Sequence, residues 1–151
     1  AAEYNVPLQC HTGLGKLEKS NAMQMQEVIC KNPETRFVLF HGSYPWIQDI
    51  CALIHNHPNV YADICWLPII SGNACENLLK ELIEVGTTDR ITWGCDSWTS
   101  EESFGAMLAA KQIVSKVFAG YTDSCYLSLA DAQDFIQQIF YGNAKKLYYK
   151  S

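Results

Sequence analysis

Short apolar runs alternate with amphipathic stretches along most of this chain. The apolar runs lie at 5–10, 36–40, 59–66 and 90–95, and each has the length of a buried strand. The amphipathic stretches lie at 21–31, 46–55, 73–85, 99–117 and 128–141, with a shorter one at 144–149. The pattern predicts four strands that alternate with helices, followed by further helices at the C-terminal end.

Capping residues mark the expected ends of several helices. Asn73 is the expected N-cap of the helix that presents Leu78, Leu79, Leu82 and Ile83 on one face, and Gly86 suits its C′ position. Thr99 and Glu102 form a capping-box pattern for the next helix. Gly142 is expected to close the helix that begins near Ser128.

Strands that are apolar on both faces and alternate with helices indicate an α/β fold with a parallel sheet and right-handed crossovers. Four such units fit either half of a (β/α)8 barrel or a small doubly wound sheet. We expect residues 1–151 to form one (β/α)4 unit with extra C-terminal helices. The chain starts a few residues before its first strand and without Met, which is typical of a piece of a longer protein.

Polar side chains suited to metal or proton chemistry end three of the four strands: His11, His41 and Asp96. The carboxyl ends of parallel barrel strands face one pocket, so these residues are expected to converge. Imidazole nitrogen and carboxylate oxygen together suit zinc or a similar divalent ion. The pair His55 and His57 ends a helix and precedes a strand, so we expect it at the opposite end of the barrel.

The amino-acid composition argues against several classes of function. Among the 151 residues, 48% are hydrophobic and the formal net charge is −5, and the longest basic run is Lys145–Lys146. Phosphate binding would need a positive stripe, so no nucleic-acid partner is expected. Asp63 and Pro68 interrupt the longest apolar run, so no membrane partner is expected. The seven cysteines form no C-x-x-C pair, which favours reduced thiols and a cytoplasmic location.

Five segments carry a resemblance to a known family: PLQCHTGLG, FVLFHGSYPW, PNVYADICW, ITWGCDSW and FYGNAKKLYY. They resemble consecutive blocks of the amidohydrolase-2 family, most closely the nodulin-type members associated with glutamine-synthetase-like proteins. The resemblance implies the C-terminal half of a TIM barrel, strands five to eight, with helices outside.

The resemblance also implies roles for the residues at the strand ends. His11 would be the metal ligand of strand five. His41 would be a second ligand or a general acid, and Asp96 would bind the metal and accept a proton. The family's H-x-H pair of strand one lies outside this chain. We therefore expect the divalent metal, zinc or else manganese, to bind weakly or not at all to this chain alone.

Aromatic and hydroxyl side chains in the loops after the strands are candidates for a substrate pocket. Tyr44 and Trp46 follow His41, and Ser97 and Trp98 follow Asp96. An aromatic ring there can stack on a substrate ring, although Trp46 can equally begin the next helix and pack on it.

Three activities are compatible with these residues. The first is hydrolysis of an amide, ester or lactone by metal-activated water, on a small-molecule substrate. The second is the related nonoxidative decarboxylation, and the third is a noncatalytic binding or assembly domain. Half a barrel leaves open sheet edges, so we expect self-association or pairing with a missing N-terminal half-barrel.

Overall fold

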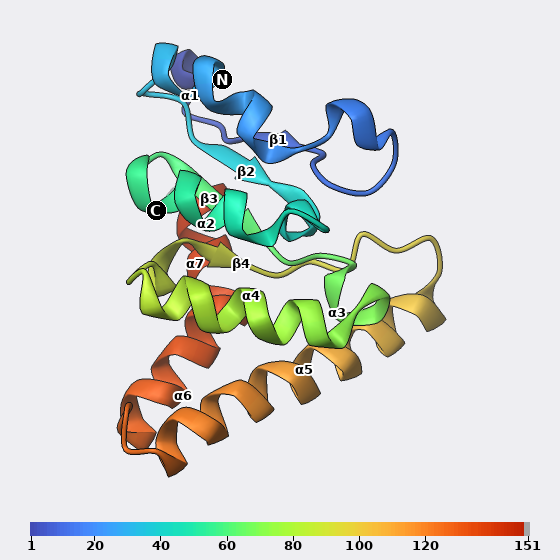
Figure 1. The fold of residues 1–151 in the computed structure, drawn as a ribbon, viewed down its shortest axis with the longest axis vertical. Helices are drawn as coiled ribbons and strands as arrows, with labels where there is room; N and C mark the ends of the chain where they lie inside the picture. Colours follow the sequence, from blue (N-terminus) through green and yellow to red (C-terminus); the bar gives the residue numbers. More distant parts are fainter. Residues whose placement is uncertain (150–151) are drawn as a thin grey trace.

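The computed structural model describes residues 1–149, and its centre is a four-stranded parallel sheet (Figure 1). The strands follow the order of the chain: β1 (Leu8–Cys10), β2 (Phe37–Leu39), β3 (Val60–Asp63) and β4 (Ile91–Thr92). Cys10 pairs with Leu39, Leu39 with Ala62, and Asp63 with Thr92. The segments that follow the strands therefore emerge along one edge of the sheet, as predicted.

Seven α-helices connect or follow the strands within the described residues, with shorter 3-10 segments between them. The α-helices are α1 (Gln26–Lys31), α2 (Ile47–Asn56), α3 (Leu67–Ile70), α4 (Gly72–Glu84), α5 (Ser100–Asp123), α6 (Leu129–Gln137) and α7 (Asn143–Tyr148). The 3-10 segments are η1 (Ala2–Tyr4), η2 (Leu17–Lys19), η3 (Ala22–Met25), η4 (Phe40–Ser43) and η5 (Thr88–Arg90), and a π-helical turn, η6 (Gln138–Gly142), joins α6 to α7. None of these described helices is both long enough and apolar enough to cross a membrane.

The main core lies between the sheet and the helices α2 and α4, which cover one face of it (Figure 1). Helix α2 packs against β3, α4 packs against α2 and α3, and α5 packs against α3 and α4. The fully buried side chains include Ile50, Leu53 and Ile54 of α2, Leu78, Leu79 and Leu82 of α4, and Val114 and Phe118 of α5. Each amphipathic stretch thus folds around its own apolar face, as the sequence predicted.

The other face of the sheet is contacted by α7. Gln9 alternates with Leu8 and Cys10 along β1, so its side chain points away from Cys10, which packs against the main core. The Gln9 amide donates to the Tyr148 hydroxyl at 2.8 Å. At the start of α7 the buried Asn143 donates to the carbonyls of Thr88 and Ile91, at 2.7 and 2.8 Å. These bonds attach the end of the chain to both edge strands.

Several element boundaries differ from the predicted ones. The apolar run 90–95 forms a strand only at Ile91–Thr92, because β4 is an edge strand with a partner on one side only. Ser71, and not Asn73, caps α4, since its hydroxyl accepts the N–H of Ala74 at 3.2 Å. Thr99 is confirmed as the N-cap of α5, but the Glu102 carboxylate accepts the N–H of Trp98 instead of that of Thr99, and α5 continues past Val117 to Asp123.

Two glycines, Gly86 and Gly142, were expected to end helices, and only Gly86 does so. Gly86 follows α4 with a φ of +80°, and the N–H of Thr87 bonds the Leu82 carbonyl, which confirms it as the C′ residue. Gly142 does not end its helix, because it keeps right-handed helical dihedrals and the chain runs on into α7. The bonds of Asn143 to the start of β4 account for this continuation.

Candidate metal centre

Two loops at the carboxyl edge of the sheet hold the two histidines. His11 follows β1, and His41 lies in η4 directly after β2. Each is followed by a glycine that the packing requires. A Cβ on Gly13 would lie 2.4 Å from the Tyr44 carbonyl oxygen, and one on Gly42 would lie 2.3 Å from Leu78 Cδ2. The H-T-G and H-G motifs are thus needed for the two loops to pack against their neighbours.

His41 is fully buried, and the carbonyl of Cys65 fixes its ring. Nδ1 lies 3.1 Å from this carbonyl oxygen. A carbonyl can only accept, so Nδ1 carries the proton and Nε2 of the neutral ring keeps its lone pair. Burial lowers the pKa of His41 below its usual value, which keeps the ring neutral at physiological pH.

In His11 the two ring nitrogens exchange these roles. Its Nε2 donates to the carbonyl of Leu14, which favours the tautomer with the proton on Nε2 and the lone pair on Nδ1. His11 Nδ1 lies 3.2 Å from His41 Nε2. In the tautomers that these two carbonyls favour, two lone pairs face each other.

Asp96 adds a carboxylate acceptor beside His41. Its Oδ2 lies 3.7 Å from His41 Nε2, and its side chain is 46% exposed. Asp96 has a φ of +48° in the loop between β4 and α5, four residues beyond the end of β4. His11 Nδ1 and Asp96 Oδ2 thus each lie next to His41 Nε2. Among the described residues, the group whose ligand atoms all lie within 4.8 Å of one another contains His41 and Asp96 but not His11.

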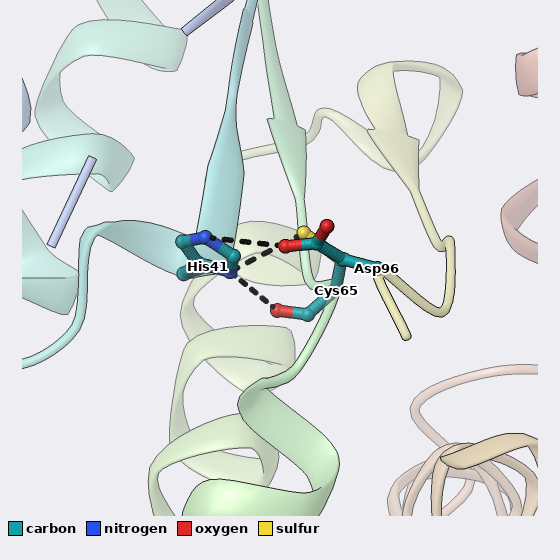
Figure 2. Close-up of side chains that lie close together, drawn as sticks. All are labelled: His41, Cys65 and Asp96. Carbon is teal, nitrogen blue, oxygen red and sulfur yellow. Dashed lines mark hydrogen bonds and ion pairs between the residues drawn. The ribbon is translucent and has the colours of Figure 1, made fainter. Parts of the chain in front are cut away.

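Cys65 is the residue at this centre that the sequence prediction missed. His41, Cys65 and Asp96 offer ligand atoms that all lie within 4.8 Å of one another, from the ends of three successive strands (Figure 2). Cys65 Sγ lies 3.4 Å from His41 Nδ1, the nitrogen that already donates to a carbonyl. Burial, followed by the nearby charge of Asp63, raises the pKa of the Cys65 thiol. Both facts disfavour the thiolate that a metal ligand must be.

A second missed residue, Asp63, holds the segment that contains Cys65. This buried carboxylate ends β3. It accepts the N–H of Cys65 at 2.8 Å and the hydroxyl of Thr92 at 2.7 Å. No motif of the sequence marks Asp63 as a structural acceptor, because its partner Thr92 becomes a neighbour only when β3 pairs with β4.

A cavity of about 310 Å³ adjoins the centre on the α7 side of the sheet. Residues from β1, β3, β4 and α7 line it, together with residues just past the strand ends. The lining residues are Gln9, Phe40, Asp63, Cys65, Thr92, Trp93, Gly94, Asp96, Ala144 and Tyr148. This lining contains neither Lys nor Arg.

The four proposed pocket residues lie outside the lining of this cavity. Tyr44 is half-buried against the main core, and Trp46 is the N-cap residue of α2. The Ser97 hydroxyl lies 2.5 Å from that of Ser103, and Trp98 is 85% exposed.

The histidine pair His55 and His57 lies at the opposite edge of the sheet. His55 is in the last turn of α2, and the carbonyl of His57 accepts from the Arg90 guanidinium at 2.8 Å, just before β4. This is the edge at which the strands begin, as expected, whereas His11 and His41 lie at the edge at which the strands end.

Two solved structures share this fold almost throughout. A protein from Lactobacillus casei described as a metal-dependent hydrolase matches 98% of the chain with a TM-score of 0.82 and 25% identity. A uronate isomerase from Thermotoga maritima matches 98% with a TM-score of 0.80 and 18% identity. The chain covers 40% and 38% of these proteins, respectively. It is therefore the C-terminal half of a TIM barrel, as the resemblance implied.

A relative and a family model complete the comparison. Protein fluG of Emericella nidulans is 36% identical over 152 residues, which cover 95% of the chain but 17% of fluG. The chain thus spans about a sixth of the length of this curated relative. The family model described as amidohydrolase matches residues 1–149. With the histidines and the carboxylate at the strand ends, this match identifies the chain as a member of the amidohydrolase family.

Proposed function

We propose that this chain provides part of the active site of a metal-dependent hydrolase that cleaves an amide, ester or lactone. The observation that carries the proposal is that His11 Nδ1 faces His41 Nε2 at 3.2 Å, with the Asp96 carboxylate 3.7 Å from the same His41 nitrogen. These three groups would hold the metal. Two imidazoles and a carboxylate fit zinc, and manganese is the second choice.

Each of the chain's own residues has a distinct task in this proposal. A divalent cation supplies Lewis acidity, which lowers the pKa of a water toward about 7. Asp96 is half exposed, so its carboxylate can accept the proton of an attacking water. His41 stays neutral because it is buried, and it keeps Nε2 directed at His11 and Asp96.

The cavity beside the centre favours hydrolysis over decarboxylation. A decarboxylase binds a substrate carboxylate, which a positive side chain beside the metal would stabilise further. The residues that line this 310 Å³ cavity include the carboxylates Asp63 and Asp96 and no Lys or Arg. A neutral small molecule with an amide, ester or lactone group suits this lining better than an anion does.

The proposed setting is a longer cytoplasmic protein. Residues 1–151 would form one half-barrel domain, and the other half of the barrel, or a second copy of this chain, would cover its open edges. The seven free thiols favour a reducing compartment. The noncatalytic alternative applies if this chain holds no metal in any context.

The test is zinc binding, measured by calorimetric titration of metal-free protein, with elemental analysis of protein purified without chelator. His11→Ala and His41→Ala should each weaken zinc binding by at least about tenfold, since each removes one ligand. The double variant His55→Ala/His57→Ala is the matched control, because it removes two histidines at the opposite edge. It should bind zinc as the wild type does.

Two outcomes contradict the proposal. One is zinc affinity that stays the same in both ligand variants, and the other is a wild-type chain with no saturable zinc site even when it is assembled with the N-terminal half-barrel. Loss of zinc in the His55/His57 control would overturn the placement of the centre.

A further inference from the structure

Residues 63–66, the end of β3 and the turn after it, surround His41 although they belong to a different strand. Trp66 stacks its indole on the His41 ring, with centroids 5.3 Å apart and 29° between the planes. The carbonyl of Cys65 accepts the His41 Nδ1 proton, and Asp63 holds the N–H of Cys65. This single segment thus contacts the His41 ring both on its face and at its Nδ1 edge.

The turn at Trp66 is strained. Trp66 has φ +61° and ψ −35°, and the N–H of Leu67 bonds the Cys65 carbonyl at 2.7 Å. This is the positive-φ form of the γ-turn, which is rare and costs free energy in any residue with a Cβ. A bulky aromatic residue at such a position indicates that another requirement outweighs the strain.

The strained turn makes two contacts possible at once. It directs the Cys65 carbonyl toward His41 Nδ1 as well as toward Leu67, and it turns the Trp66 side chain back over the imidazole. Glycine would adopt this backbone without strain, but it would leave the ring of His41 uncovered. The backbone conformation alone therefore does not explain why position 66 is a tryptophan.

We infer that Trp66 is a positioning residue for His41. It holds the imidazole against the Cys65 carbonyl, so that the ring keeps the Nδ1–H tautomer and Nε2 stays free at the centre. The inference rests on the proposed function only in the part that makes His41 Nε2 a metal ligand. The tautomer itself is a property of the metal-free chain.

The experiment compares the wild type with Trp66→Phe and Trp66→Gly. Long-range proton–nitrogen NMR spectra of the metal-free proteins report the tautomer of His41, which is assigned from a His41→Gln spectrum. The wild type and Trp66→Phe should show a single Nδ1–H tautomer, because phenylalanine keeps a stacked ring. Trp66→Gly should show both tautomers and bind zinc about 10- to 100-fold more weakly.

The outcomes separate this inference from the proposed function. An Nε2–H tautomer of His41 in the wild type would overturn the inference, even if Trp66→Gly did not fold. So would a Trp66→Gly variant that folds and keeps both the tautomer and the zinc affinity of the wild type. A wild type with no zinc site, even when assembled with the N-terminal half-barrel, but with a single Nδ1–H tautomer that Trp66→Gly loses would contradict the proposed function and support the inference.

Discussion

Gly42 lies so close to Leu78 of α4 that a Cβ at position 42 would be 2.3 Å from Leu78 Cδ2. The contact joins the loop that holds His41 directly to the main core. Gly42 also has a φ of +56°, which side chains rarely adopt. The residue after His41 is therefore set by packing and backbone conformation, and the position of the histidine depends on it.

Replacing this glycine should destabilise the fold. Gly42→Ala should lower the free energy of unfolding by roughly 2–4 kcal/mol, the sum of overpacking against Leu78 and the cost of the positive φ. Urea denaturation measures the change. Gly105→Ala is the matched control, because Gly105 is exposed in α5 and a Cβ there meets nothing within 4 Å. The control should gain up to about 1 kcal/mol, and an equal loss in both variants would contradict the packing argument.

Asn143 should be required for the attachment of α7 to the sheet. Asn143→Ala removes both donors to the carbonyls of Thr88 and Ile91, and it should cost about 1–3 kcal/mol in unfolding free energy. Asn143→Asp should cost more, since a carboxylate would face two carbonyl oxygens. The exposed Asn77 of α4 provides the control substitution to Ala. A neutral Asn143→Ala would show that these bonds contribute nothing net.

The buried imidazole of His41 should make stability depend on pH. The pKa of His41 is lowered by burial, whereas an unfolded histidine has a pKa of about 6.5. The unfolded state therefore binds more protons in the window below about 6.5, so the stability from neutral His41 is complete above this window. It falls as the pH drops toward the folded pKa and is lost below it.

Comparison with a variant that lacks the ring isolates this contribution. Denaturation with chelator present, at about pH 7.5 and about pH 5.5, should show a larger loss for the wild type than for His41→Phe. Each tenfold lowering of the ring's proton affinity corresponds to about 1.4 kcal/mol. Equal losses in the two proteins would mean that His41 has the same pKa in the folded and unfolded chains.

The exposed edge of β1 should drive self-association of the isolated chain. β1 is at one end of the sheet, and Leu8 is 42% exposed on it. We expect sedimentation velocity to show species larger than the monomer at micromolar concentrations. Leu8→Lys should reduce them, because a charge on an edge strand opposes pairing. Val28→Lys, at a comparable 44% exposure on α1, should leave the association unchanged.

A monomer at every concentration would contradict self-association. Co-expression of the chain with a separate N-terminal half-barrel then tests the other partner. A stable complex that Leu8→Lys weakens would show that the same edge serves that contact.

Local sequence patterns predicted much of this fold. The alternation of apolar runs and amphipathic stretches determined the order of strands and helices, because each element buries its own apolar face. Parallel strands share one carboxyl edge, so His11, His41 and Asp96 could be placed near one another before any contact was known. The remote position of His55 and His57 followed from the same rule.

Which further residues surround His41 was decided only by the tertiary structure. Cys65, Asp63 and Trp66 reach His41 because β3 pairs beside β2, a contact between residues more than 20 positions apart that no local pattern encodes. The tautomers of the two histidines depend on carbonyls in other loops. Likewise, Gly142 does not end its helix, because Asn143 bonds to β4. Local spacing determines which elements form, whereas long-range hydrogen bonds and packing determine what each side chain contacts.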